Sequence, residues 1–188
     1  MRIRTPREQR IHSIKTVIRW ILYYMVILLC FLVMTSGTWM KPMLLVPAAI
    51  AIAANSGQYG SALAGAVCGF LTDIACGKLV GYNAVLLTFF CIVVSLLYEY
   101  YLRNKFVNYI IITSVAAYIQ CWLDYKFYYE MWEYADVELI FSQISMKVWA
   151  LTIISAVFIY LIIAPVNRFF LPKDHITIEE AIKGRSEQ

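Results

Sequence analysis

The chain of 188 residues is 62% hydrophobic, has a mean hydropathy of +0.69, and carries 16 lysines and arginines against 12 acidic residues. Soluble domains are about 45–50% apolar, and a water-soluble fold of this size could not bury the excess. The composition therefore excludes a soluble protein and predicts an all-α, polytopic membrane protein, a bundle of about six transmembrane helices without a separate soluble domain.

The N-terminal part of the chain contains a basic segment and two apolar segments. Residues 1–17 are predicted to form a cytoplasmic tail, and residues 18–36 a first span that acts as an uncleaved signal anchor, since its apolar run is too long for a secretory signal. The second apolar segment, 43–54, would cover only about 18 Å as a helix, short of a hydrocarbon core of roughly 30 Å. We expect it to extend into its flanks, to tilt or to be re-entrant.

Four further spans complete a predicted transmembrane bundle over residues 18–166. Pro165 and Pro172 are expected to end the last helix, so that residues 167–188 form a second cytoplasmic tail. With six spans and both termini inside, most of the 16 basic residues lie on the cytoplasmic side, and omitting the second span destroys this asymmetry. The four spans are predicted at 58–76, 82–102, 107–123 and 144–164.

The segment 125–142 is predicted to be an acidic and aromatic loop on the outer surface. Four aromatic residues recur in and before it at helical spacing, which predicts a short helix lying in the headgroup region. An ordinary aromatic belt is the favoured interpretation, and a recognition surface is the alternative. The four residues are Trp122, Tyr125, Tyr129 and Trp132.

Residues that usually carry catalysis or bind metals are sparse in the predicted spans. The two histidines, His12 and His175, lie in the tails, and the five cysteines lie in apolar segments with no CxxC pair. No nucleotide-binding, metalloprotease or serine hydrolase motif occurs. We therefore expect no enzymatic activity, no cofactor and no metal site.

A stripe of small residues with one carboxylate marks the third predicted span. Positions four apart advance by about 40° around a helix, so the stripe forms a narrow face on which another helix can pack closely. Asp73 lies on this face and is expected to point toward a neighbouring helix. The stripe comprises Gly57, Ser61, Gly65, Gly69, Asp73 and Gly77.

Two roles of Asp73 remain open from the sequence. The favoured role is structural, in which Asp73 caps or pins the end of its helix; binding of a partner or ligand is the alternative. Its hydrogen-bond donor could be a backbone amide of 77–83, the Asn83 side chain or Lys78. If Asp73 only accepts hydrogen bonds, Asp73→Asn is expected to be mild and Asp73→Leu to impair folding or assembly.

The segment 60–90, GSALAGAVCGFLTDIACGKLVGYNAVLLTFF, resembles the signature region of the rod shape-determining protein MreD family. That family shows a glycine-spaced helix ending in an aspartate, a short turn with a glycine, a further glycine, and a helix that opens with a small residue. The length, the predicted spans and the basic tails also agree. The corresponding positions are Gly65, Gly69, Asp73, Gly77, Gly81 and Ala84, with Asn83 where polar residues are common in the family.

The resemblance implies a multi-pass protein of the bacterial cytoplasmic membrane, surrounded by lipid, with a fold similar to the substrate-binding subunits of energy-coupling-factor transporters. It implies a non-enzymatic component of the cell elongation (rod) complex that helps maintain cell shape by binding an MreC-like protein. MreB, a RodA-type glycosyltransferase and a class B penicillin-binding protein of the peptidoglycan synthesis machinery are the implied associates, and no nucleic acid is expected.

Two other functions fit the sequence. The first is a small-molecule-binding subunit of an energy-coupling-factor type transporter, with its ligand among the outer halves of the helices. Such a site needs a cavity with convergent polar groups, for which Gln58, Asn83, Gln120 and Asp124 are the candidates. The second is a membrane chaperone or scaffold unrelated to cell walls.

Overall fold

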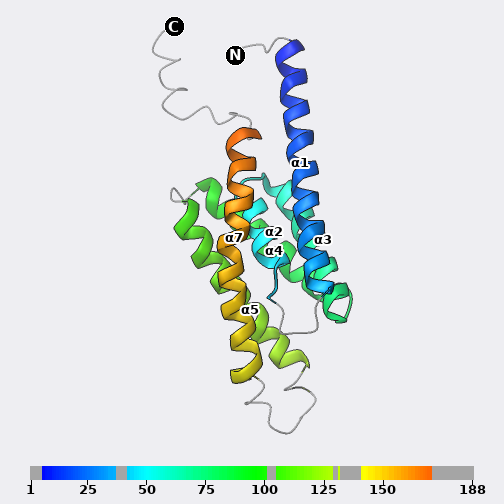
Figure 1. The fold of residues 1–188 in the computed structure, drawn as a ribbon, viewed down its shortest axis with the longest axis vertical. Coiled ribbons are helices and arrows are strands. Elements are labelled where there is room, and N and C mark those ends of the chain that lie inside the picture. The colour runs from blue at the N-terminus through cyan, green and yellow to red at the C-terminus, as the bar shows by residue number, and fades with distance from the viewer. Residues whose placement is uncertain (1–5, 37–41, 101–104, 129–130, 132–140, 171–188) are drawn as a thin grey trace.

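A computed structural model describes residues 6–36, 42–100, 105–128, 131 and 141–170 of the chain. Regular structure in these residues is entirely helical, which confirms the predicted all-α fold (Figure 1). The elements are α1 (Pro6–Thr35), α2 (Leu45–Ala53), α3 (Gln58–Cys76), α4 (Tyr82–Tyr100), α5 (Lys105–Tyr128), the single π-helical turn η2 (Phe141–Ser145) and α7 (Met146–Phe170).

Five helices in the described part of the chain are long and apolar enough to cross a membrane. Each spans at least the 18 to 20 residues that a hydrocarbon core of roughly 30 Å requires. The chain is therefore a multi-pass helical membrane protein. The five segments are Ser13–Thr35, Gln58–Cys76, Tyr82–Tyr100, Phe106–Tyr128 and Gln143–Phe169.

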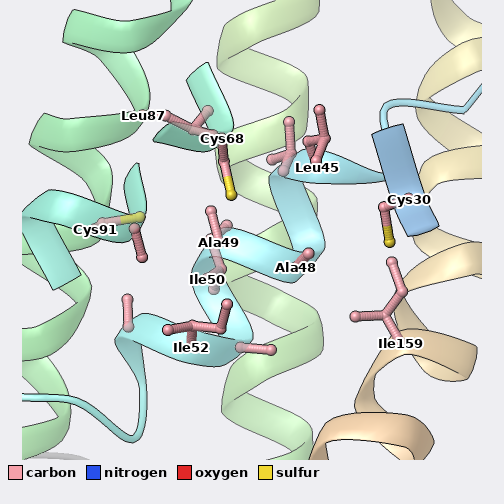
Figure 2. Packing of buried hydrophobic residues seen from close by; sticks show 14 of the residues in the cluster. Cys30, Leu45, Ala48, Ala49, Ile50, Ile52, Cys68, Leu87, Cys91 and Ile159 are labelled. Carbon is pink, nitrogen blue, oxygen red and sulfur yellow. The ribbon is translucent and has the colours of Figure 1, made fainter. Parts of the chain in front are cut away.

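The short helix α2 forms the centre of the bundle. Every side chain of Leu45–Ala53 is buried, and α2 contacts each of the five long helices. In Figure 2, Ile50 of α2 lies between Cys91 of α4 on one side and Ile159 of α7 on the other. Because all of these side chains are apolar and four of the nine are alanines, neighbours can surround α2 on all sides. The helix has nine residues, about 14 Å, so the second segment is shorter as a helix than the predicted 43–54.

The segment around α2 runs through the bundle from one end to the other. At its start, Met43 lines the same cavity as Gly77, the residue that ends α3. At its end, the carbonyl of Ser56 accepts a hydrogen bond of 2.9 Å from the hydroxyl of Ser95, near the other end of α4. The segment therefore passes from the α3–α4 turn to the opposite end.

Helices α1 and α7 pack antiparallel. The hydroxyl of Tyr23 donates a hydrogen bond to Oδ1 of Asn167, and Cys30 lies opposite Ile159 in the core. The start of α1 and the end of α7 therefore lie at the same end of the bundle, the upper end in Figure 1.

The structure corrects the predicted end of the last helix. Helix α7 continues through Pro165 to Phe170, whereas the sequence predicted a stop at Pro165 and a tail from 167. Proline removes only one backbone donor, and helices in an apolar bundle tolerate this loss because their neighbours compensate for it. Asn167 is buried against Tyr23, which holds this last part of α7 in place. Pro172 lies outside the described residues.

Two other predicted boundaries are also corrected. The first helix begins at Pro6, so most of the predicted tail 1–17 is helical, in keeping with the preference of proline for the first turn. Helix α5 extends to Tyr128 rather than ending at 123, because residues 124–128 pack against the α3–α4 turn through Asp124 and Tyr128. The start of the predicted outer loop is therefore the last turn of α5.

Candidate functional site

The glycine stripe of α3 packs directly on the backbone of α4. A Cβ atom added to Gly69 would lie 2.3 Å from Cα of Ala84, and one added to Gly65 would lie 2.8 Å from the carbonyl oxygen of Leu87. Ser61 continues the stripe, and its buried hydroxyl donates to backbone carbonyls at the end of α2 and before α3. The close-packing face is thus filled by α4 of the same chain and not open to a partner helix.

Asp73 closes the turn between α3 and α4. The residue is fully buried, and its Oδ2 accepts a hydrogen bond of 2.8 Å from the amide of Gly81. Its Oδ1 accepts from the backbone amide and the side-chain Nδ2 of Asn83, at 3.2 and 2.7 Å. Both carboxylate oxygens are therefore used within the chain, in the structural role that the sequence favoured.

The turn itself depends on two glycines with left-handed backbone. Gly77 ends α3 with φ of 63°, and Gly81 has φ of 103°, values that side-chain-bearing residues rarely adopt. The amide of Lys78 donates to the carbonyl of Asp73 at 3.0 Å, which completes a helix-ending motif of the Schellman kind. These glycines direct the chain so that the amides of Gly81 and Asn83 point at the carboxylate.

The hydrogen bonds of Asp73 continue to a third helix. Nε2 of Gln120 in α5 donates to Oδ1 of Asn83 at 2.6 Å, and both side chains are fully buried. Among the described residues, Oε1 of Gln120 has no hydrogen-bond partner. One chain of hydrogen bonds, Asp73 to Asn83 to Gln120, therefore joins α3, the start of α4 and α5.

Lys78 pairs with Asp124 and not with Asp73. Its Nζ lies 2.5 Å from Oδ2 of Asp124 and 5.7 Å from the centre of the Tyr128 ring, and the Tyr128 hydroxyl accepts a hydrogen bond from the amide of Leu79. Sequence reasoning missed this ion pair. The signal available in the sequence was the spacing of Gln120 and Asp124. They lie four residues apart and therefore share one face of α5, so a helix face that carries Gln120 toward Asn83 also carries Asp124 toward the α3–α4 turn.

Burial and charge act in opposite directions on Lys78. Burial lowers the pKa of Lys78, and the neighbouring Asp124 carboxylate and its hydrogen bond raise it by more, so the pKa lies above its ordinary value of 10.5. The folded state therefore favours the charged ammonium group. This contribution to stability is fully present below about pH 10.5 and is lost as the pH rises through the raised pKa.

A cavity of about 320 Å³ adjoins this ion pair. It lies between the α3–α4 turn, the last turns of α5, and η2 with the start of α7. Oδ1 of Asp124 is buried and has no hydrogen-bond partner in the described part of the chain. The residues that line the cavity are Met43, Cys76, Gly77, Lys78, Cys121, Asp124, Tyr125, Tyr128, Ile144, Ser145 and Val148.

The predicted aromatic surface is only partly described. Trp122 is 42% exposed on α5, with the ammonium group of Lys126 5.2 Å from its ring centre. The Tyr125 ring instead packs edge to face on Phe141 of η2, with 4.8 Å between ring centres, and borders the cavity. These two residues belong to α5 and not to a separate interfacial helix. Tyr129 and Trp132 lie outside the described residues.

Lys78→Met is expected to lower the stability of the folded protein by about 1–2 kcal/mol, because it leaves Asp124 buried without its cation. The loss is smaller than for a fully buried pair because the side chain of Lys78 is 19% exposed and solvent screens it. Lys147→Met removes an exposed lysine at the same end of the bundle and is the matched control. Thermal unfolding in mild detergent measures both. The difference in stability between the wild type and Lys78→Met should shrink above about pH 10.5. A difference in stability that does not change with pH would contradict the ion-pair explanation.

The carboxylates and thiols at this end of the bundle do not form a metal centre: within the described ranges, no three His, Cys, Asp or Glu residues come together to hold an ion. What the geometry provides is a hydrogen-bonded turn, a neutralised ion pair and an adjoining cavity. No protein family, curated protein or solved structure that was compared matches the chain.

Proposed function

We propose that the chain is a non-enzymatic, MreD-like component of the bacterial cell elongation complex. In this role it binds an MreC-like protein and, with it, MreB filaments, a RodA-type glycosyltransferase and a class B penicillin-binding protein. One observation carries the proposal: the glycines, the aspartate and the asparagine on which the MreD resemblance rests pack or hydrogen-bond within one α3–α4 unit.

The Asp73 network supports a scaffold better than a catalyst. All three hydrogen bonds to the carboxylate come from the chain itself, and the residue is fully buried, so Asp73 has no surface on which to act on a substrate. A network of this kind fixes helix positions. The function then depends on the outer faces of the bundle, which a single span of an MreC-like protein can contact.

A six-crossing topology with both termini in the cytoplasm is part of this proposal. Residues 42–56 run through the interior between the two ends of the bundle and would supply the second crossing, although α2 alone is too short. The start of α1 and the end of α7 lie at the same end of the bundle. This supports the proposed orientation, in which positive-inside bias favours cytoplasmic tails at both ends of the chain. A short buried helix with five long ones is also compatible with the fold implied by the resemblance, that of energy-coupling-factor substrate-binding subunits.

Removal of the gene tests the scaffold function. Cells without the protein are expected to lose their rod shape, and the recovery of the RodA-type enzyme with tagged MreC-like protein is expected to fall. Wild-type protein should restore both, and Asp73→Leu at equal expression should not. Unimpaired shape together with unimpaired recovery would overturn the proposal.

The cavity favours a second candidate, a small-molecule-binding subunit of an energy-coupling-factor type transporter. It brings Asp124, one of the polar residues considered from the sequence, together with Lys78 in a hollow of about 320 Å³. Paired ATPases and a coupling subunit among the co-purifying proteins, with no MreC-like protein, would favour this second candidate over the scaffold.

A further inference from the structure

Arg19 is a buried cation without a counter-ion. It lies on α1 and is only 8% exposed. Its guanidinium group lies over the ring of Tyr23, with 5.8 Å between Cζ and the ring centre. Within the described part of the chain, Arg19 forms no ion pair and no hydrogen bond. A buried charge is costly unless it is paired, so this site lacks an anion.

The two outer nitrogens of the Arg19 guanidinium group are accessible. Of its three nitrogens, Nε is the one that is both buried and without a partner. Nη1 and Nη2 also have no hydrogen-bond partner among the described residues, and they are not buried, so each retains exposed surface. An anion can therefore reach both. Two parallel N–H groups of an arginine fit two oxygens of a phosphate or carboxylate group.

Arg19 lies where the charged part of α1 ends. No charged side chain follows it in this helix, from Trp20 to Thr35, and it belongs to the membrane-spanning segment Ser13–Thr35. Ile18 and Ile21 on either side of it are 37% and 56% exposed, as expected for side chains that face lipid. The guanidinium group is therefore at the boundary between headgroups and hydrocarbon, where a phospholipid presents its phosphate.

Two further cations lie at this end of the bundle, where α1 and α7 pack together (Figure 1). Lys15 is exposed one turn before Arg19 on α1, and Arg168 is exposed in the last turn of α7. Residues four apart lie on the same side of a helix, so Lys15 and Arg19 repel each other, and an anion between them would offset this repulsion. Tyr23 beside the guanidinium group is bonded to Asn167, which places Arg19 near the contact of α1 with α7.

We propose that Nη1 and Nη2 of Arg19 bind the phosphate group of an anionic phospholipid, with Lys15 as a second cation. The phosphate is that of a lipid and not a free ion, because apolar, lipid-facing side chains flank Arg19 along α1. Basic sites between transmembrane helices bind anionic headgroups in this way. The proposal requires a membrane protein only, and it applies equally to the scaffold and to the transporter subunit.

Thermal unfolding of the delipidated full-length protein in dodecyl maltoside tests the site. The probes are phosphatidylglycerol, which is anionic, phosphatidylcholine, which has no net charge, and inorganic phosphate. Phosphatidylglycerol is expected to raise the Tm of the wild type by about 5 °C more than phosphatidylcholine does. Inorganic phosphate should not raise it. Absence of an anionic-lipid effect, or an equal shift with inorganic phosphate, would overturn the proposal.

A pair of arginine variants tests whether the effect arises at Arg19. Arg19→Gln is expected to show equal shifts with the two lipids. Arg168→Gln removes an exposed arginine at the same end of the bundle and should retain the wild-type preference for phosphatidylglycerol. If Arg19→Gln does not fold, Arg19→Lys replaces it; it keeps the charge but loses the paired N–H groups, so at least half of the preference should disappear. Equal behaviour of the Arg19 and Arg168 variants would indicate diffuse attraction and overturn the site. No MreC-like protein is present, so a failure here is distinct from a failure of the scaffold function.

Discussion

Gly69→Ala is expected to lower the stability of the folded protein by about 3 kcal/mol and to reduce the yield of monodisperse protein in mild detergent. The new methyl group would lie 2.3 Å from Cα of Ala84 and 2.5 Å from the carbonyl oxygen of Asn83. These are backbone atoms, which cannot rotate away as a side chain can, so α3 and α4 must separate. Overpacking of this kind costs about 1–3 kcal/mol, and separation of the helices also disturbs the hydrogen bonds of Asp73.

Gly57→Ala is the matched control for Gly69→Ala. Gly57 precedes α3, has φ of −68°, and has no atom within 4 Å of an added Cβ. Its replacement should change the unfolding temperature little. Unfolding temperatures and size-exclusion profiles of the two variants measure the difference. Equal behaviour of Gly57→Ala and Gly69→Ala would mean that the contact between α3 and α4 is looser than the structure indicates.

Asp73→Leu is expected to be the most damaging single change at the α3–α4 turn. It leaves three donors without an acceptor: the partly buried amide of Gly81 and the buried amide and side-chain Nδ2 of Asn83. At about 1–3 kcal/mol for each unsatisfied group, the loss should be roughly 3 kcal/mol or more. Cellular abundance and thermal unfolding in mild detergent both measure this loss of stability. Glu99→Leu removes an exposed acidic residue at the end of α4 and should be tolerated.

Asp73→Asn tests whether both accepting oxygens of the Asp73 carboxylate are needed. The sequence predicted a mild effect if the carboxylate only accepts hydrogen bonds. The structure shows that it only accepts, but with both oxygens, so an amide would turn its NH₂ group toward Gly81 or Asn83. We therefore expect the stability of Asp73→Asn to lie between that of the wild type and that of Asp73→Leu. Wild-type stability of both variants would contradict the network.

The sequence was sufficient to predict the helical membrane fold and the packing role of the α3 stripe. Long apolar runs and four-residue spacing of small residues are local signals, and they led directly to Gly65, Gly69 and Asp73. The donors to Asp73 were among those considered because a turn of a few residues limits what can reach it. These features depend on residues that are close together in the chain.

Features that depend on distant residues were missed or misplaced. The pairing of Lys78 with Asp124 joins positions 46 apart in the chain, and the continuation of α7 past Pro165 depends on Asn167 meeting Tyr23 from the other end of the chain. The length of α5 follows from its contacts with the α3–α4 turn. Neither hydropathy nor spacing contains this information.

The most direct test of the scaffold function is affinity purification of the tagged protein from its own cells in mild detergent, with identification of the co-purifying proteins. We expect an MreC-like protein with peptidoglycan synthases, at levels that fall at least tenfold with Asp73→Leu and remain unchanged with Glu99→Leu. Recovery of paired ATPases and a coupling subunit, without an MreC-like protein, would contradict the scaffold function.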